Sequence, residues 1–209
     1  MISPSSEKPV VHLVDDDDSF RKAVTRLLQT AGYDVRTYRT AGDFALAPRE
    51  NRRGCLLLDV QMPGPSGLDL QKALGKEAEP LPVIFLTAHA DVAISVQAMK
   101  AGASDFLTKP VKRDVLLTAI RTALARDTRM HASHEHRHEL QARFEKLTAR
   151  EREVFDLVVA GKLNKQIAAE LGMAERTVKA HRAQVMTKMR ATSLAELVHL
   201  ADEIQSEQT

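Results

Sequence analysis

Acidic residues, a threonine and a lysine stand where short apolar runs end in this 209-residue chain. Asp15 and Asp16 follow the first run, Asp59 ends the third, Thr87 the fourth and Lys109 the fifth. In an open parallel sheet the carboxyl ends of the strands share one edge, where ligands bind, so these side chains are expected to converge. Close carboxylates repel one another by about 4 kcal/mol per pair at 4 Å and an effective dielectric near 20. A hard divalent cation with oxygen ligands, Mg²⁺ or Mn²⁺, would relieve that repulsion.

The acidic run at 15–18 has two further members that need a different explanation. Asp17 and Asp18 precede a helical pattern that starts near Ser19. They are expected to cap the free N–H groups of that helix and to face its positive end, which is worth about 0.3–1 kcal/mol each. Taken alone, the four aspartates fit caps or solvated charges equally well. Together with the other strand-end residues, they favour a metal site.

Five apolar runs alternate with five helical patterns over the first 125 residues. Three of the runs are almost continuously apolar, as is typical of strands buried on both faces. This alternation predicts a doubly wound (βα)5 domain of the α/β class, with a parallel sheet and right-handed crossovers. The expected strands are 10–14, 34–38, 55–60, 82–88 and 105–109, and the expected helices are 19–31, 41–50, 67–75, 92–101 and 112–126.

The segment from Arg126 to Lys146 is polar and contains neither proline nor glycine. We expect a long linker, helical and continuous with the fifth helix. His131, His134 and His138 share one helical face, so a metal site is conceivable. The preferred interpretation is a solvated helical linker, because no carboxylate or cysteine constellation supports the metal site.

Residues 147–209 predict an all-α domain of four helices. Thr148 and Glu151 have the spacing of a capping box, Asn164 is the expected cap of the second helix, and Ser193 caps the fourth. The second helix is expected to end at Gly172, and the tight turn there, followed by a longer helix, is typical of a helix-turn-helix. The expected division is therefore 1–125, 126–146 and 147–209.

A basic patch is hidden in the chain's net charge of +2. Positions 148 to 190 contain nine lysines and arginines and five acidic residues, which gives a local charge of +4. On the third helix of this half, Val178, Val185 and Met189 fall on one stripe and should be core. The opposite face carries Arg176, Lys179, Ala180, Ala183, Thr187 and Arg190.

That basic face suits DNA. Small side chains let a helix approach the major groove closely, and an alanine can contact a thymine methyl group. Basic and polar residues beside them are expected to contact phosphates, which fix position without reading sequence. These expected phosphate contacts are Lys165, Thr177, Arg182 and Lys188.

Cysteine usage and hydropathy point to the cytoplasm. The chain has one cysteine, Cys55, so it cannot form an intrachain disulfide, and this residue is expected in the core. The start "MISPSSEKPV" lacks the basic and apolar regions of a signal peptide. No apolar stretch reaches the roughly 18 residues that span a bilayer, so no membrane partner is expected.

The first 125 residues resemble the receiver domain of two-component response regulators. The resemblance rests on "DD" at 15–16, "DVQMPGPSG" at 59–67, "FLTAHA" at 85–90 and "GASDFLTKP" at 102–110. It implies that Asp59 accepts a phosphoryl group from a histidine kinase. It also implies that Asp16 binds Mg²⁺ directly and Asp15 through water, while the Gln61 carbonyl and the Asp59 carboxylate complete the protein ligands.

The residue types agree with this chemistry. Asp59 is a carboxylate nucleophile that would give an acyl phosphate with about two negative charges. Balancing that charge beside two further carboxylates needs both the metal ion and Lys109. The Thr87 hydroxyl can turn toward a phosphoryl oxygen, and in similar receivers an aromatic ring, here Phe106, rotates inward behind it.

Residues 147–204 resemble the LuxR-type helix-turn-helix domain, particularly its FixJ-type members. In similar domains the positions of Lys179, Ala180 and Ala183 reach base edges. Some relatives carry a lysine where Ala183 stands, which leaves the target sequence open. FixJ-like receivers dimerise through the fourth helix, so Val96 and Lys100 are expected at an interface of a phosphorylation-dependent homodimer. Two recognition helices would then read an inverted repeat with half-sites about one helical turn apart.

The leading interpretation is a phosphorylation-controlled transcription factor that binds promoter DNA and activates transcription with RNA polymerase. No enzymatic activity is expected apart from self-catalysed phosphoryl transfer and slow autodephosphorylation. A Mg²⁺-dependent phosphohydrolase is the first alternative, but position 61, where such an enzyme carries a general-acid aspartate, is Gln61. A protein-interaction module is the second alternative, and the basic helical face argues against it.

Overall fold

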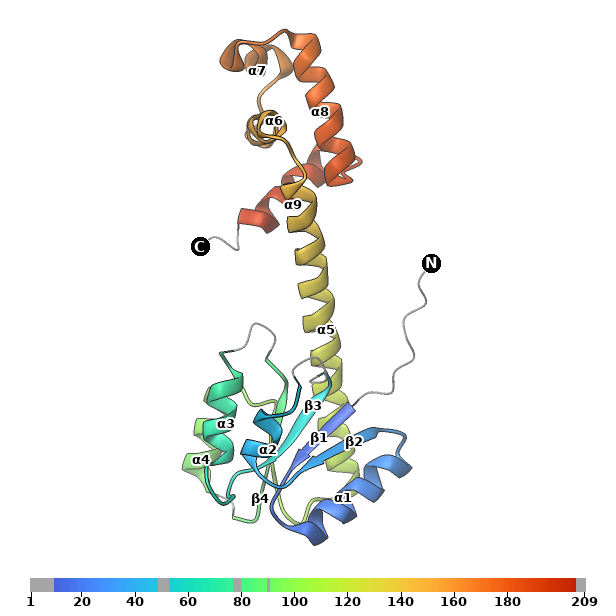
Figure 1. Ribbon diagram of the computed structural model, residues 1–209, viewed down its shortest axis with the longest axis vertical. Coiled ribbons are helices and arrows are strands. Elements are labelled where there is room, and N and C mark those ends of the chain that lie inside the picture. Colours follow the sequence, from blue (N-terminus) through green and yellow to red (C-terminus); the bar gives the residue numbers. More distant parts are fainter. Residues whose placement is uncertain (1–9, 49–52, 77–79, 90, 206–209) are drawn as a thin grey trace. The chain divides into compact units, whose positions relative to one another are not determined.

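The computed structural model describes residues 10–48, 53–76, 80–89 and 91–205 (Figure 1). The chain divides into two compact units, the first ending at His131 and the second beginning at Ala132. Helix α5 (Arg113–Glu145) is continuous through this division. The expected helical linker that continues the fifth helix is therefore observed.

The described residues of the first unit form a five-stranded parallel sheet of order β2-β1-β3-β4-β5. This confirms the predicted doubly wound fold, and each strand lies within one residue of its expected bounds at either end. The strands are β1 (Val10–Val14), β2 (Asp34–Tyr38), β3 (Cys55–Asp59), β4 (Val83–Thr87) and β5 (Asp105–Thr108). The helices between them are α1 (Asp18–Thr30), α2 (Ala41–Ala45), α3 (Gly67–Leu74) and α4 (Val92–Lys100).

The central strands are buried on both faces because helices cover both. Leu57 belongs to a core that includes residues of α1 and α5, whereas its neighbours Leu56 and Leu58 belong to a second core with residues of α2, α3 and α4. Figure 1 shows α2, α3 and α4 gathered on one side of the sheet. Side chains alternate between the faces of a strand, so an uninterrupted apolar run serves both cores.

Two local expectations for the first unit were wrong. Asp17 is the N-cap of α1 and accepts the N–H groups of Ser19 and Phe20, as expected, but Asp18 is already inside the helix. The Asp18 carboxylate lies in the first turn of α1, at the positive end of the helix as expected, but it pairs with Arg21 instead of capping an N–H group. Helix α2 ends at Ala45, short of the expected 50, and the end of that expected range lies outside the described residues.

The second unit contains the four expected helices, α6 (Ala149–Val159), α7 (Asn164–Leu171), α8 (Glu175–Met189) and α9 (Leu194–Gln205). The Thr148–Glu151 capping box is confirmed, and the Ser193 hydroxyl caps α9 by accepting the Glu196 N–H at 3.1 Å. Helix α7 ends at Gly172, whose φ of 63° is the left-handed conformation that glycine favours. Residues 172–174 form the turn that leads into α8.

The expected cap of α7 was wrong. Leu163 is the N-cap residue, and its N–H donates to the Gln166 side chain at 2.8 Å. Asn164 lies one residue inside the helix, and its Oδ1 accepts a hydrogen bond from Arg182 of α8 at 3.2 Å. Asn164 is thus the first residue of α7 but not its cap, and its side chain joins the two helices of the helix-turn-helix.

Two remaining expectations concern the core and the membrane. Cys55 is fully buried, and burial, with the Asp127 charge adding to it, raises the pKa of its thiol far above the usual range. It is a core residue, as expected. Among the described residues, none of the helices combines the length and apolarity that crossing a bilayer requires.

Candidate functional site

Three carboxylates meet at the carboxyl edge of the sheet. Asp15 and Asp16 follow β1, and Asp59 is the last residue of β3, the neighbouring strand. One ligand oxygen from each lies within 4.8 Å of the others. Asp15 is fully buried, Asp59 is 7% exposed and Asp16 faces solvent. The convergence predicted from strand ends is therefore present, with one carboxylate open to the outside.

Lys109, directly after β5, bridges two of these carboxylates. Its Nζ donates to Asp15 Oδ2 at 2.6 Å and to Asp59 Oδ2 at 2.7 Å. Burial would lower the pKa of Lys109, but the two carboxylates outweigh it and raise that pKa. Burial also raises the pKa of Asp15, in spite of the hydrogen bond from Lys109. The Lys109 ammonium therefore does not fully offset the cost of burying the charged form of Asp15.

The backbone holds the other oxygen of each buried carboxylate. Asp15 Oδ1 accepts the N–H of Asp17 at 3.0 Å, and Asp59 Oδ1 accepts the N–H of Gln61 at 3.0 Å. Each carboxylate is thus oriented by a turn on one side and by Lys109 on the other.

This arrangement fits a hard divalent cation. Three carboxylates and one ammonium leave two negative charges unbalanced, and all the side-chain ligand atoms are carboxylate oxygens. Mg²⁺ and Mn²⁺ prefer such ligands and retain several waters, so an exposed side at Asp16 suits them. The residues therefore fit the metal that the sequence predicted.

Two residues that support the site were missed by the sequence analysis. Arg21 is 9% exposed and donates from Nη1 to the Asp15 carbonyl at 2.6 Å, which fixes the turn carrying both N-terminal aspartates. At Gly67, the first residue of α3, a Cβ would stand 2.3 Å from the Asp59 carbonyl oxygen. Gly67 is the last residue of the motif at 59–67, so the sequence did offer a reason to connect it with the site. Arg21, a polar residue in a helical pattern, carried none.

Thr87 and Phe106, the two other residues expected to respond to phosphorylation, belong to the neighbouring strands β4 and β5. The Thr87 hydroxyl donates to the His89 carbonyl at 3.0 Å and accepts the His89 N–H at 3.2 Å. It is therefore bonded within the loop that follows β4. The Phe106 ring is half-buried, with its centroid 6.0 Å from that of Phe85.

Helix α4 presents an apolar surface. Val92 is 76% exposed, Val96 46% and Met99 47%, while Lys100 at the end of the helix is also exposed. Large exposed apolar residues gathered on one helix are typical of an interaction surface.

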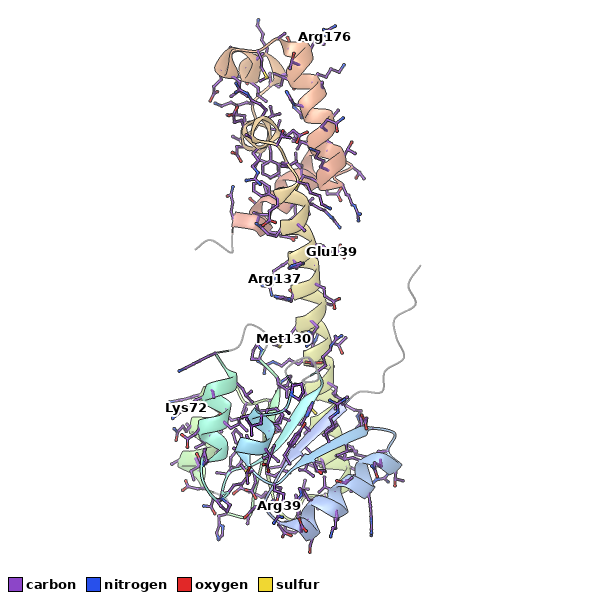
Figure 2. The ribbon with its side chains drawn as sticks, in the orientation of Figure 1. Arg39, Lys72, Met130, Arg137, Glu139 and Arg176 are labelled. Atoms are coloured by element: carbon purple, nitrogen blue, oxygen red, sulfur yellow. The ribbon has the colours of Figure 1, made fainter. Side chains whose placement is uncertain are left out.

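Helix α8 divides into a buried stripe and an exposed face as its sequence predicted. Val178, Val185 and Met189 are fully buried. Figure 2 labels Arg176 at the N-terminal end of this helix. Within the part of the chain that the structure describes, Arg176, Lys179 and Arg190 form no ion pair. The exposed residues of the opposite face are Arg176, Lys179, Ala180, Ala183, Thr187 and Arg190, and Thr177 and Lys165 of α7 are exposed as well.

The structure assigns two of the expected phosphate contacts to internal bonds. Lys188 Nζ donates to Glu151 Oε2 at 2.5 Å and to the Lys146 carbonyl at 3.2 Å, so it joins α8 to the start of α6. Glu151, which is almost fully buried, holds this ammonium, so the expected phosphate contact of Lys188 would have to be made alongside an internal ion pair. Arg182 is half-buried and bonds Asn164.

The linker histidines do not form a metal cluster within the described residues. There, the aspartates at the sheet edge are the group of three with ligand geometry. His131 pairs instead with Asp127 at 3.3 Å, and the Asp127 carboxylate accepts the Gly54 N–H at 3.1 Å. These contacts hold the beginning of the expected linker on the first unit. From Ala132 to Glu139, all residues except His134 are exposed, which fits a solvated helix.

Family models match both units. Residues 11–121 match the response regulator receiver domain, and residues 145–201 match the bacterial regulatory proteins of the luxR family. The chain belongs to the response regulators that combine these two domains. As a response regulator, it serves phosphorylation-dependent regulation of transcription, with a histidine kinase upstream and DNA as its target. The recognition and the fold class predicted from the sequence are confirmed.

Relatives of this response regulator cover almost its whole length. Nodulation protein W of Bradyrhizobium diazoefficiens is 42% identical over 198 residues, covering 95% of this chain and 87% of that protein. The transcriptional regulatory protein FixJ of Azorhizobium caulinodans is 43% identical over 191 residues, covering 91% and 90%. Among solved structures, response regulator StyR superposes with a TM-score of 0.86 at 44% identity, covering 94% of this chain and 99% of that one. Full-length FixJ from B. japonicum superposes with a TM-score of 0.58 at 38% identity, covering 95% of this chain and 98% of that one.

Proposed function

We propose that Asp59 is the residue that accepts the phosphoryl group from the histidine kinase. The observation that carries this proposal is the position of Asp59 in a bridge: its Oδ1 is held by the Gln61 N–H, and its Oδ2 by Lys109. The carboxylate nucleophile is thus held next to the Lys109 ammonium. This ammonium can pair with the phosphoryl oxygens as negative charge moves onto them. In phosphoryl transfer, such positioning and charge neutralisation supply most of the catalysis.

Asp15, Asp16 and Asp59, with the Gln61 carbonyl, would hold Mg²⁺ or Mn²⁺ at this edge. When bound, the metal ion would neutralise charge on the transferring group. The chain's own contribution is the pre-formed carboxylate set and Lys109, which carries a positive charge to a phosphoryl oxygen. Water can attack the same acyl phosphate, so slow autodephosphorylation is expected, without turnover of other phosphoesters.

Thr87 and Phe106 are proposed as the switch. A phosphoryl group on Asp59 offers the Thr87 hydroxyl a charged acceptor, and charge-assisted hydrogen bonds are roughly twice as strong as the neutral bonds it now makes with His89. As Thr87 turns, it leaves space into which the Phe106 ring can rotate. The local change then reaches the surface of α4 through a two-state rearrangement.

That surface is the proposed phosphorylation-dependent homodimer contact, with Val96 and Lys100 in it. The exposed apolar side chains of α4 support this assignment. Dimerisation would bring two DNA-binding halves together and raise their joint affinity for an inverted repeat. We keep 1–125, 126–146 and 147–209 as the functional division into receiver, linker and DNA-binding domain.

In the DNA-binding domain we propose that α8 is the recognition helix. Lys179, Ala180 and Ala183 would reach base edges, with Arg176 beside them, and Lys165, Thr177 and Arg182 would contact phosphates. Lys188, whose bond to Glu151 helps to hold α8 in place, would be a further phosphate contact. Bound to a promoter, the protein would activate transcription with RNA polymerase, and it would work in the cytoplasm, where bacterial DNA lies.

The test is phosphorylation-dependent binding of a pool of genomic DNA fragments, followed by gel shift. Treatment with acetyl phosphate and Mg²⁺ should shift inverted-repeat fragments with the natural chain and not with Asp59→Asn. Asp34→Asn, an exposed carboxylate at the opposite edge of the sheet, is the matched control and should behave as the natural chain does. Equal enhancement in Asp59→Asn would refute the proposal, and so would an absence of DNA binding in every state.

A further inference from the structure

The ammonium group of Lys109 has a third contact besides its two carboxylates. A lysine ammonium carries three N–H donors. Two point to Asp15 Oδ2 and Asp59 Oδ2. On another side, Nζ lies 4.2 Å from the centroid of the Phe20 ring. A cation this close to the face of an aromatic ring is attracted by the ring's negative quadrupole.

Phe20 is itself held firmly. It lies in the first turn of α1, and its N–H donates to the Asp17 side chain at 3.1 Å. Its half-buried ring packs against the core that β1, α1 and α5 share. The same cap that starts α1 therefore also fixes where this ring stands relative to the acidic edge.

The ring limits where a flexible side chain can go. The Lys109 backbone is anchored by its N–H, which donates to the Thr87 carbonyl at 2.7 Å. Between that anchor and the ammonium lies a four-carbon stem with several rotatable bonds. When phosphate replaces a carboxylate oxygen as the partner of the ammonium, the two carboxylate bonds must rearrange. The ring contact can persist through that exchange, because it involves neither Asp15 nor Asp59.

We propose that Phe20 is a positioning residue for phosphoryl transfer, whose ring face seats the Lys109 ammonium within reach of the group arriving on Asp59. The proposal rests on the proposed role of Asp59 as acceptor. A ring that served only to fill space could be replaced by any apolar side chain of similar size. A cation–π contact requires the face of an aromatic ring. An aliphatic and an aromatic replacement of Phe20 should therefore have different effects, which tests the proposal.

The first experiment compares Phe20→Leu, which keeps apolar volume, with Phe20→Tyr, which keeps the ring. The readouts are the rate constant for phosphorylation by acetyl phosphate at saturating Mg²⁺ and the affinity for beryllofluoride, followed by ¹⁹F NMR. Phe20→Leu should lower both by about three- to tenfold, the range expected for one partly desolvated cation–π contact. Phe20→Tyr should restore both to within about twofold of the natural chain. Equal values for the Leu and Tyr variants would overturn the proposal.

The second experiment needs no phosphorylation. A double-mutant cycle combines Phe20→Leu with Lys109→Met and follows urea unfolding of the full chain by tyrosine fluorescence. Both tyrosines, Tyr33 and Tyr38, lie in the first unit, and the chain has no tryptophan. The fold-change in the unfolding constant caused by Phe20→Leu should be about three- to tenfold smaller when Lys109 is absent. If Phe20→Leu changes the unfolding constant equally with and without Lys109, the proposed contact between the ring and the ammonium is contradicted. If that contact is found while Asp59→Asn still accepts phosphate, the assignment of Asp59 fails and the contact stands.

Discussion

Lys109 and Asp59 are separated by 50 residues of sequence, and yet the ammonium of one lies 2.7 Å from the carboxylate of the other. The same ammonium lies 2.6 Å from Asp15. Lys109 therefore occupies carboxylate oxygens that a metal ion would share, and it stands where phosphoryl charge would develop. On the proposed mechanism, one side chain would compete with the metal before phosphorylation and assist it during transfer.

Removal of this ammonium should separate those two roles. Lys109→Met should bind Mg²⁺ about tenfold more tightly, because a positive charge within roughly 4 Å of the ligands is lost. The same variant should be phosphorylated by acetyl phosphate at least about tenfold more slowly, since one phosphoryl-neutralising charge is missing. Calorimetric Mg²⁺ titration and labelling measure the two effects. Lys112→Met, an exposed lysine three residues on, is the control, and weaker Mg²⁺ binding in Lys109→Met would contradict the argument.

Gly67 should tolerate no side chain. A Cβ at this position would stand 2.3 Å from the Asp59 carbonyl oxygen and 3.1 Å from side-chain carbons of Leu58 and Phe85. Gly67→Ala should therefore reduce the free energy of unfolding of the receiver by about 1–3 kcal/mol, as overpacking does. Urea unfolding followed by tyrosine fluorescence reports it. Gly42→Ala in α2 is the matched control: its Cβ would stand 3.6 Å from the nearest atom, Thr40 Oγ1, so it should be neutral or stabilising.

The DNA-binding domain should lose stability in acid through Glu151. The Glu151 carboxylate accepts the Lys188 ammonium at 2.5 Å and the Thr148 N–H at 2.7 Å. The Lys188 bond first, and the Thr148 bond next, hold the pKa of Glu151 below its usual value of 4.5. Because the folded-state pKa is lowered, this contribution is complete above pH 4.5 and disappears as the pH falls through the folded-state pKa.

The measurement for Glu151 is the melting temperature by circular dichroism as a function of pH. The natural chain should be more stable than Glu151→Gln at neutral pH, and the difference should shrink below pH 4.5. Taking the difference between the two chains removes the titration of all other carboxylates. A constant difference across that pH range would mean that the bond to Lys188 does not depend on the charge of Glu151.

Substitutions on the exposed face of α8 should affect DNA binding in different ways, depending on whether the residue reads bases or contacts phosphate. Ala183→Glu adds a bulky negative group to the middle of the exposed face and should abolish DNA binding. Arg176→Ala should weaken binding and, if Arg176 contacts one phosphate, lower the slope of log affinity against log salt by about one. Lys22→Ala, an exposed lysine on α1, should change neither. Fluorescence anisotropy over a salt series measures all three variants, and unimpaired binding by Ala183→Glu would rule out α8 as the recognition helix.

The sequence predicted the sheet and the convergence of its strand-end residues well, because both depend on strong local patterns. Apolar runs such as 55–58 are long enough to define strands, and topology then places Asp15, Asp59 and Lys109 at one edge. The stripe of Val178, Val185 and Met189 was equally predictable from helical periodicity.

What escaped prediction depends on the exact positions of side chains in three dimensions. Asp18 and Asn164 have good capping side chains, but each lies one residue inside its helix and bonds an arginine instead. Lys188 reads as one more surface cation, although the buried Glu151, 37 residues earlier, captures it. Phe20 and Arg21 stand next to each other in a helical pattern and give no sign that they contact the site.

Chemical mapping of the phosphorylated residue is the most direct test of this account. After treatment with acetyl phosphate and Mg²⁺, borohydride reduction converts an aspartyl phosphate to homoserine, which tandem mass spectrometry locates. The account predicts homoserine at position 59 and nowhere else. Homoserine at position 15 or 16, or an unmodified Asp59 in a chain that has taken up phosphate, would contradict it.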